Sequence, residues 1–289
     1  MALLAGSFES AFFNSDEEPM RVLVFGEYSG RVRDAFKARG HQAMSCDLLP
    51  TDVPGLHYEG DGMKILDGWM PVAYTAQCDP DGDGWCHQCD CDPNDCLCIG
   101  PTEDRIEYKE IDGEMFGRPK EHPHWDLMVC HPTCTYLTCS AEWAYKEGPY
   151  HQEVEEGTLV GAERVQAREE AINFCIRLMD APIKKIALEN PVGVLSKRMA
   201  EPTQYIQPYE YGDDASKKTC LWLKGLKPLV PTDFIPPRLA PTANGKGYAF
   251  RWGNQTDSGQ NKETPGEDRW KIRSTTWMGW ANAMGDQWG

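Results

Sequence analysis

The sequence lacks two features that would place it in the membrane or in a secretory pathway. No apolar run approaches the roughly 20 residues that a membrane-spanning helix needs, and the mean hydropathy is −0.56. The first 20 residues contain no basic stretch and only a short apolar run, which is not the pattern of a secretory signal peptide. We therefore expect residues 1–20 to form a loosely ordered arm and the chain to reside in a reducing cytoplasm.

Positive charge is also scarce. The chain has 29 Lys and Arg against 45 Asp and Glu, a formal net charge of −16, which argues against a general nucleic-acid binder. The acidity is concentrated, because residues 71–115 hold twelve acidic and two basic residues, whereas residues 216–289 hold eleven basic and six acidic ones. The C-terminal quarter is therefore basic, which weakens the argument against a nucleic-acid partner.

The elements that are present indicate an α/β fold. With 289 residues, 40% of them apolar, the chain can bury a core as one large domain with insertions or as two small domains. The stretch RVLVFGEYSG (21–30) is typical of a buried strand that ends in a glycine-bounded loop, residues 31–40 have helical spacing, and HQAMSCDLLP (41–50) indicates a second strand ending at Asp47. This order predicts a parallel sheet.

The first loop also suits a nucleoside cofactor. Its N–H groups can approach a ligand, and Asp47 at the end of the second strand can hold ribose hydroxyls. The loop GEYSG is not the GxGxxG of dinucleotide-binding proteins, so a dinucleotide is disfavoured. A plain strand-to-helix turn without a ligand is the alternative.

Further strands and helices follow along the chain, and no internal repeat is visible. The stretches WDLMVC (125–130), KKIALEN (184–190) and KKTCLWLKGL (217–226) indicate strands, and AERVQAREEAINFCIRLMD (162–180) indicates a long amphipathic helix. We assign a core to residues 21–70 and 120–226, and an acidic, cysteine-rich insertion to residues 71–119. Residues 271–289 have the spacing of a C-terminal helix that returns to the core, and residues 227–270 carry few periodic signals.

Chemically useful side chains stand at the predicted strand ends. Asp47, Asp61, Glu189 and Cys134 all follow or end such strands, and ligands of open parallel sheets bind at this edge. A thiol and a carboxyl at one edge suit attack on a ring carbon while a ring nitrogen is protonated. A half-buried thiol at a turn, with no role in chemistry, is the alternative for Cys134.

The order of these pieces resembles the DNA cytosine-5 methyltransferases, and more closely their compact phage-type members, over residues 21–68, 125–226 and the last fifteen. The resemblance implies a class I, Rossmann-like methyltransferase domain that binds S-adenosylmethionine, a DNA partner, and a phage-encoded protein in a bacterial cytoplasm. It implies that the cofactor is bound by Phe25, Gly26, Glu27, Tyr28, Gly30, Asp47, Asp61 and Pro132. It also implies that Cys134 and Glu189 are catalytic and that Asn190 contacts the cytosine.

The chain departs from the family pattern at several places. Pro132-Thr133-Cys134 stands where the family has Pro-Pro-Cys, and Pro191 follows Glu189-Asn190 where the family has Val. Lys217 and Lys218 replace an arginine-rich strand, and we predict that they contact the substrate. Residues 227–270 form a small recognition region, in which Arg251 is our candidate for DNA contact; a solvated loop is the alternative there.

The resemblance implies a covalent mechanism. Cys134 attacks carbon 6 of a cytosine, Glu189 supports the proton at ring nitrogen 3, and carbon 5 takes the methyl group before loss of its proton expels the thiol. The base must be flipped or already single-stranded. Two other functions remain open: a related enzyme that transfers another one-carbon group or acts on RNA or nucleotides, and a non-catalytic acidic binding protein on the same scaffold.

The cysteine-rich insertion predicts a metal site. Six of the twelve cysteines lie between Cys78 and Cys98, and a dense cluster in a cytosolic chain indicates metal ligation. Four of them have spacing that fits a structural zinc ion: Cys86, Cys89, Cys96 and Cys98. The acidic run 79–84 also matches half of a calcium loop, and a metal-free acidic loop is the third reading. Because this module repels phosphates, we expect it to lie away from the DNA or to contact a protein partner.

Overall fold

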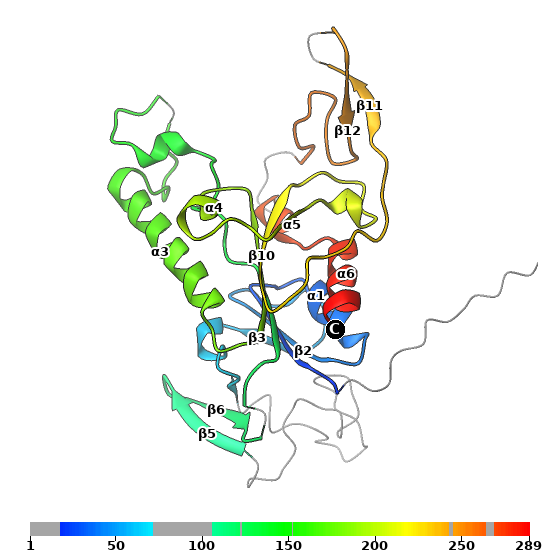
Figure 1. The fold of residues 1–289 in the computed structure, drawn as a ribbon. Helices are drawn as coiled ribbons and strands as arrows, with labels where there is room; N and C mark the ends of the chain where they lie inside the picture. The colour runs from blue at the N-terminus through cyan, green and yellow to red at the C-terminus, as the bar shows by residue number, and fades with distance from the viewer. Residues whose placement is uncertain (1–17, 72–105, 122, 152, 243–244, 264–268) are drawn as a thin grey trace, which may run out of the picture.

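The computed structural model describes residues 18–71, 106–121, 123–151, 153–242, 245–263 and 269–289. Its centre is a seven-stranded sheet in the order β3-β2-β1-β7-β8-β10-β9 (Figure 1). These strands are β1 (Arg21–Phe25), β2 (Gln42–Asp47), β3 (His57–Glu59), β7 (Leu127–Cys130), β8 (Lys185–Pro191), β9 (Gln204–Ile206) and β10 (Thr219–Lys224).

The sheet is mostly parallel. Strands β1, β2, β3, β7 and β8 pair in parallel, and β10 runs antiparallel to both of its neighbours, β8 and β9. If the seven strands of this sheet are renumbered 1 to 7 in chain order, they stand in the order 3-2-1-4-5-7-6. The first five follow the order of a doubly wound Rossmann sheet. The chain thus has an α/β fold that is compatible with the Rossmann-like fold expected from the sequence.

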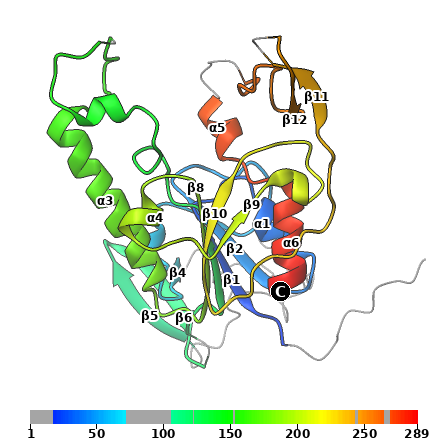
Figure 2. The same cartoon turned by 45° about the horizontal axis from the view of Figure 1, so that its top comes forward.

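Apolar side chains on both faces of the strands build two core layers. Along β1, Leu23 and Phe25 belong to one buried cluster, and Val22 and Val24 belong to the other, as the two-residue period of a strand requires. The first cluster is covered by α3 (Gly161–Met179), and the second by α1 (Arg31–Lys37) and α6 (Met278–Trp288), which lie on opposite sides of the sheet (Figures 1 and 2).

Short elements complete the connections. They are η1 (Gly62–Lys64), η3 (Glu142–Tyr145), α4 (Leu195–Arg198), η4 (Pro208–Glu210) and α5 (Arg269–Ser274). Helix α6 packs tightly on α1, since a Cβ atom on Gly285 would lie 3.0 Å from the Ala35 carbonyl oxygen. An ion pair of 2.6 Å between Arg39 Nε and Asp286 Oδ1 joins the same two segments.

Two small sheets stand at opposite ends of the molecule. Strands β4 (Met70–Pro71), β6 (Glu114–Pro119) and β5 (Ile106–Ile111) form a three-stranded antiparallel sheet at the bottom of the view in Figure 1. Strands β11 (Arg238–Pro241) and β12 (Tyr248–Arg251) form a hairpin at the top. The predicted insertion thus contains a hairpin in the part that the structure describes, while the proposed zinc ligands Cys86, Cys89, Cys96 and Cys98 lie outside the described residues.

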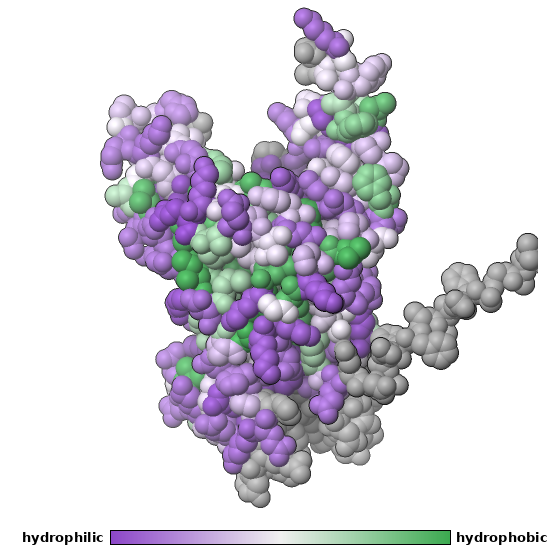
Figure 3. Space-filling model, viewed as in Figure 1, coloured by the Kyte–Doolittle hydropathy of each residue, from purple (hydrophilic) through white to green (hydrophobic). Residues whose placement is uncertain are grey.

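The surface is largely hydrophilic, with apolar side chains on the β11–β12 hairpin (Figure 3). Figure 3 also shows a hollow between two projections, one formed by this hairpin and the other by the N-terminal end of α3 with the segment before it. Within the described ranges, no helix combines the length and the apolar character needed to cross a membrane.

Candidate functional site

The side chains predicted at the strand ends meet at one edge of the central sheet. Strands β7 and β8 are in register, with Cys130 opposite Leu188, so the turn after β7 lies beside the end of β8. The Asn190 amide nitrogen donates a hydrogen bond of 2.9 Å to the Pro132 carbonyl oxygen. Because Thr219 at the start of β10 pairs with Pro191, Lys217, which lies two residues before Thr219, reaches the same edge.

Cys134 lies in the tight turn that follows β7. Its carbonyl oxygen accepts hydrogen bonds from the N–H groups of Leu137 and Thr138, at 3.0 and 3.2 Å. Burial raises the pKa of the Cys134 thiol; the charge of Lys217 opposes this rise, as does Arg273 to a smaller extent, while Glu189 adds to it. In the free protein Cys134 is therefore a thiol, held beside two cations that favour its thiolate.

Glu189 is buried on β8 against a histidine, His131, that the sequence analysis did not select. The ring atom His131 Nδ1 lies 3.1 Å from Glu189 Oε2, and the backbone N–H of His131 donates to the Phe25 carbonyl oxygen. Burial alone would raise the pKa of Glu189, but the hydrogen bond from His131 and the charge of Lys217 outweigh it, so that the pKa is lowered. Glu189 is therefore a carboxylate at neutral pH.

Three polar atoms at this edge are buried without a hydrogen-bond partner among the described residues. They are His131 Nε2, Glu189 Oε1 and Asn190 Oδ1. Buried polar groups are nearly always paired, so such atoms call for an explanation, and a bound polar ligand is one. All three belong to adjacent strands or to the turn next to Cys134, so a polar ligand bound at this edge would pair with them.

The first loop is held by backbone contacts. The N–H groups of Gly26 and Glu27 both donate to the Cys46 carbonyl oxygen, at 2.8 and 3.0 Å, so these two N–H groups do not approach a ligand. Gly26 has a φ of 74°, and a Cβ atom there would lie 2.5 Å from the His131 carbonyl oxygen. The glycine thus allows β1 and the turn after β7 to approach closely.

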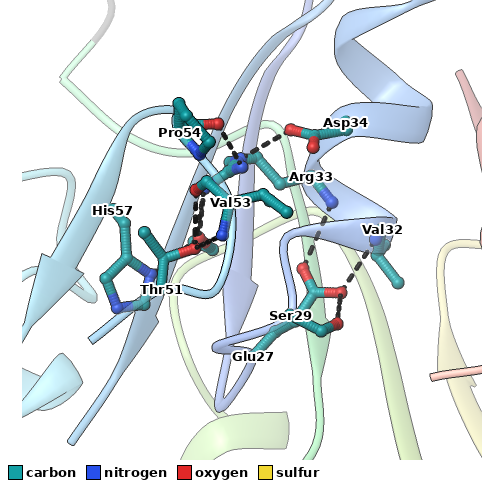
Figure 4. Close-up of polar contacts among 10 residues, drawn as sticks. Glu27, Ser29, Val32, Arg33, Asp34, Thr51, Val53, Pro54 and His57 are labelled. Carbon is teal, nitrogen blue, oxygen red and sulfur yellow. Dashed lines mark hydrogen bonds and ion pairs between the residues drawn. The ribbon is translucent and has the colours of Figure 1, made fainter. Parts of the chain in front are cut away.

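The side chain of Glu27 caps α1. Its carboxylate accepts hydrogen bonds from the N–H groups of Val32 and Arg33, at 2.8 and 3.2 Å, and from the Ser29 hydroxyl at 3.1 Å (Figure 4). The position of Glu27 in the loop predicts cofactor binding, but its carboxylate is already used to satisfy free N–H groups at the start of a helix. Gly30, with a φ of 70°, is the residue before that helix.

The aromatic residues of the first loop point into the protein. The Phe25 ring packs in the core, 5.8 Å from the Phe174 ring, and closely approaches Gly62 in the turn after β3. Tyr28 is buried, and its hydroxyl donates to the Lys271 carbonyl oxygen on α5 at 2.5 Å. Tyr28 therefore links the first loop to the C-terminal segment.

Asp47 and Asp61 lie at neighbouring strand ends. The Gly60 N–H donates to the Asp47 carbonyl oxygen at 2.8 Å, which brings the turn of Asp61 next to Asp47. Asp47 Oδ1 accepts from the Leu49 N–H at 3.0 Å, and burial is the main cause that raises the pKa of Asp47. Asp61 Oδ1 accepts from the Met63 N–H at 3.0 Å.

A buried arginine holds the chain segment that follows Asp47. Arg33 on α1 is fully buried and donates to Asp34, to the Pro54 carbonyl oxygen at 2.9 Å and to the Ser45 hydroxyl at 3.3 Å (Figure 4). The helical spacing indicates a surface position for this charge, and no signal in the sequence marks it as buried. Its network fixes the loop between β2 and β3.

The three predicted substrate-binding cations have different surroundings. Lys217 Nζ donates to the Arg273 carbonyl oxygen at 3.2 Å and lowers the pKa values of both Cys134 and Glu189, so it belongs to the site. Lys218 Nζ instead lies 4.1 Å from the centre of the Tyr205 ring. Arg251 donates to the Asp257 and Phe250 carbonyl oxygens, which holds its guanidinium within the hairpin region.

Comparison with known proteins does not add a family. A scan against protein-family models and a search of curated proteins both find no match for this chain. In the part of the chain that the structure describes, no three His, Cys, Asp or Glu side chains are grouped as a metal ion requires.

Proposed function

We propose that this chain transfers a methyl group from S-adenosylmethionine to carbon 5 of cytosine in DNA, through a covalent bond to Cys134. The observation that carries the proposal is the group of unpaired polar atoms beside Cys134. Glu189 Oε1, Asn190 Oδ1 and His131 Nε2 are buried there without partners among the described residues. A ring with complementary polar atoms would pair with them.

A protonated cytosine ring has that complementarity. Its amino group donates hydrogen bonds, and nitrogen 3 also donates once it has taken a proton. Glu189 Oε1 and Asn190 Oδ1 are acceptors, and the lowered pKa of Glu189 keeps its carboxylate charged. A carboxylate at this place stabilises the ring proton, and this makes carbon 6 more open to attack by a thiolate.

Cys134 supplies the nucleophile, and its surroundings control its proton. The thiol has a raised pKa because it is partly buried, while Lys217 and Arg273 favour the thiolate. In the proposed reaction the Cys134 sulfur gives up its proton and forms a bond to carbon 6, while Glu189 stabilises the proton at ring nitrogen 3. Carbon 5 then takes the methyl group from the sulfonium, which leaves as a neutral thioether, and loss of the carbon-5 proton breaks the bond to the Cys134 sulfur. The two cations thus stabilise the charge that develops on sulfur as the proton leaves.

The residues at the ends of β1, β2 and β3 fit the methyl donor. Asp47 and Asp61 stand on adjacent strand ends, and a carboxylate after the second strand suits ribose hydroxyls. Gly30 and Pro132 border the same edge. The Phe25 ring, the Tyr28 hydroxyl, the Glu27 carboxylate and the N–H groups of Gly26 and Glu27 are engaged within the protein. S-adenosylmethionine, when bound, supplies a methyl group activated by a positively charged sulfur.

A DNA strand is supported as the substrate by charge and by shape. The basic residues are concentrated in residues 216–289, which contribute Lys217, Arg273 and the β11–β12 hairpin. The hairpin borders the hollow seen in Figure 3. Since a cytosine in a duplex is inaccessible, we propose that the base is flipped or single-stranded when it reaches Cys134.

The test is a trapping experiment with DNA that contains 5-fluorocytosine, analysed by intact mass with S-adenosylmethionine present. Because fluorine does not leave as a proton does, the covalent complex should accumulate with the methyl group attached. Cys134→Ala should abolish the complex, and Cys139→Ala, which removes an exposed free thiol five residues away, should leave it unchanged.

Other outcomes of this experiment separate the rival functions. An adduct whose added mass differs from a methyl group would replace methylation by transfer of another one-carbon unit. No adduct with many DNA sequences, in single and double strands, would overturn the proposal.

A further inference from the structure

A cavity of about 480 Å³ adjoins the candidate site and is not used by the chemistry above. It lies between the start of α1, the segment before β10, the region after β12 and α5. Its wall includes three cations, Arg31, Lys217 and Arg273, together with Trp277 and Glu263. These residues come from segments far apart in the sequence, so the cavity is a product of the fold.

The wall carries three cations against one acid, Glu263, whose Oε2 is buried without a hydrogen-bond partner among the described residues. Arg31 donates to the Thr276 carbonyl oxygen at 2.8 Å, and Lys217 donates to the Arg273 carbonyl oxygen at 3.2 Å. Among the described residues, no carboxylate forms an ion pair with any of the three cations, and Glu263 is the only acid that lines the cavity. Asp213 senses the charge of Arg31, but its carboxylate accepts from the Gly279 N–H.

Several arginines elsewhere on this protein are paired with acids. Arg198 pairs with Glu169 at 2.6 Å, and Arg238 pairs with Asp257 at 2.6 Å. In a chain with a net charge of −16, acidic partners are abundant. Three unpaired cations around one cavity therefore indicate a place for an anion that arrives from outside the chain.

The cavity is positioned for a group attached to the substrate of Cys134. Lys217 lines it and also acts on the charges of both Cys134 and Glu189. The Trp277 indole N–H is buried with no partner in the described ranges, so the wall holds a further donor that a small rearrangement could offer. The three cations and the indole N–H are all hydrogen-bond donors, and phosphate oxygens are acceptors.

We propose that this cavity binds the phosphate group of the nucleotide whose base reaches Cys134, with Arg31 and Arg273 as its main charged contacts. The inference rests on the proposed function and adds the anchor that holds the nucleotide in place. The phosphate has two sources, a phosphodiester of a DNA strand or the phosphate of free deoxycytidine monophosphate.

Equilibrium binding without S-adenosylmethionine tests the proposal independently of catalysis. The probe is a fluorescent single strand of about 12 nucleotides, a length within the range that single-strand-binding sites cover, with one cytosine among thymines. Arg31→Gln and Arg273→Gln should each weaken binding about tenfold, since a charge-assisted hydrogen bond to phosphate is lost. The matched control is Arg177→Gln, an exposed residue of α3, which should change binding less than twofold.

A second probe carries one uncharged methylphosphonate linkage beside the cytosine. It should bind the wild-type chain at least tenfold more weakly than the charged probe. The double variant Arg31→Gln, Arg273→Gln should lose most of this preference for the charged probe. Arg31→Lys keeps the charge and should restore most of the affinity, which separates loss of charge from loss of folding. Competition identifies the source of the phosphate. Unlabelled deoxycytidine monophosphate and deoxycytidine are each added to the bound strand, and displacement of the strand by an equal concentration of the monophosphate, but not by deoxycytidine, assigns a free nucleotide.

Unchanged binding by both glutamine variants, or no preference for the charged linkage, would overturn the phosphate site. These outcomes are distinct from failure of the proposed function. If the chain binds the probes through Arg31 and Arg273 but forms no adduct with 5-fluorocytosine, the phosphate site stands and the methyl-transfer proposal fails.

Discussion

A single contact, between His131 Nδ1 and Glu189 Oε2, controls a buried charge in this protein. The lowered pKa of Glu189 means that its carboxylate stabilises the fold above the ordinary pKa of a glutamate. That contribution is lost as the pH falls through the lowered pKa of the folded state. The charge of Glu189 is therefore maintained at neutral pH by its partners against the effect of its burial.

We expect His131→Ala to destabilise the chain at neutral pH by about 1–3 kcal/mol, because the buried carboxylate loses its hydrogen-bond donor. Burial would then dominate and raise the pKa of Glu189, so the difference from wild type should shrink as the pH is lowered and the carboxyl becomes neutral. Urea unfolding at a series of pH values measures this. His124→Ala, in an exposed position, is the control, and a difference that does not change with pH would contradict the idea.

Cys134 gives a second prediction at this scale, through its reactivity. Its pKa is raised above the ordinary value of 9.0, mainly by burial, and Lys217 opposes the rise. Alkylation by iodoacetamide should therefore continue to accelerate above pH 9. Lys217→Gln should slow it at a given pH, because the thiol then loses a positive charge that lowers its pKa. Peptide mass spectrometry locates the modified thiol.

The neighbouring lysine provides the control for this measurement. Lys218 lies over the Tyr205 ring, so Lys218→Gln should leave the alkylation rate of Cys134 unchanged. Equal slowing by both variants would show that general charge, and not the position of Lys217, acts on the thiol.

Among single residues, what the sequence could predict depended on neighbours in the chain. Cys134, Glu189 and Asn190 were selected because each ends or follows a strand with a clear apolar pattern. His131 directly precedes Pro132 and could have been selected as a side chain at a strand end, but its partner, Glu189, is 58 residues away. The burial of Arg33 depends on the loop between β2 and β3, which no local pattern encodes.

Among the elements, α1 depends on a cap that is supplied from the first loop. Glu27→Ala would leave the N–H groups of Val32 and Arg33 without their acceptor, and we expect a loss of about 1–2 kcal/mol in the free energy of unfolding, as for other helix caps. Glu27→Gln keeps an acceptor oxygen and should lose less. The matched control is Glu163→Ala on the exposed first turn of α3; an equal effect there would contradict a capping role.

Strands and helices with strong periodicity were predicted correctly, and segments built by pairing across the chain were not. The apolar runs of β1, β7 and β10 and the spacing of α3 are local properties, so they can be read from the sequence. Half of the residues in β5 and β6 are exposed, and composition alone indicated a loop. The hairpin of β11 and β12 also leaves Leu239 and Phe250 exposed, and its sequence carries no alternating pattern.

For the whole molecule, we expect the proposed zinc module and the candidate site to act independently. The described part of residues 71–119 lies at the opposite end of the molecule from the β11–β12 hairpin (Figure 1). We expect elemental analysis to find about one zinc per chain, as four cysteine ligands require, and chelation to lower the melting temperature. Trapping with 5-fluorocytosine DNA at low temperature should survive chelation.

The outcome of metal analysis also distinguishes the alternatives for this module. Calcium in place of zinc would favour the acidic run 79–84, and a chain without metal would leave an acidic loop. Replacing Cys86 and Cys89 by serine should remove the zinc, whereas replacing the buried Cys175 of α3 should leave the metal content unchanged.

Helix α6 covers α1, and the ion pair between Arg39 and Asp286 joins residues that are 247 positions apart. During synthesis on the ribosome, the apolar side of α1 therefore emerges long before the helix that shields it. Contacts between such distant segments form slowly, and uncovered apolar surface favours aggregation. We expect a nascent chain that lacks α6 to recruit chaperones, and the nucleophile to become competent only after the last helix has docked.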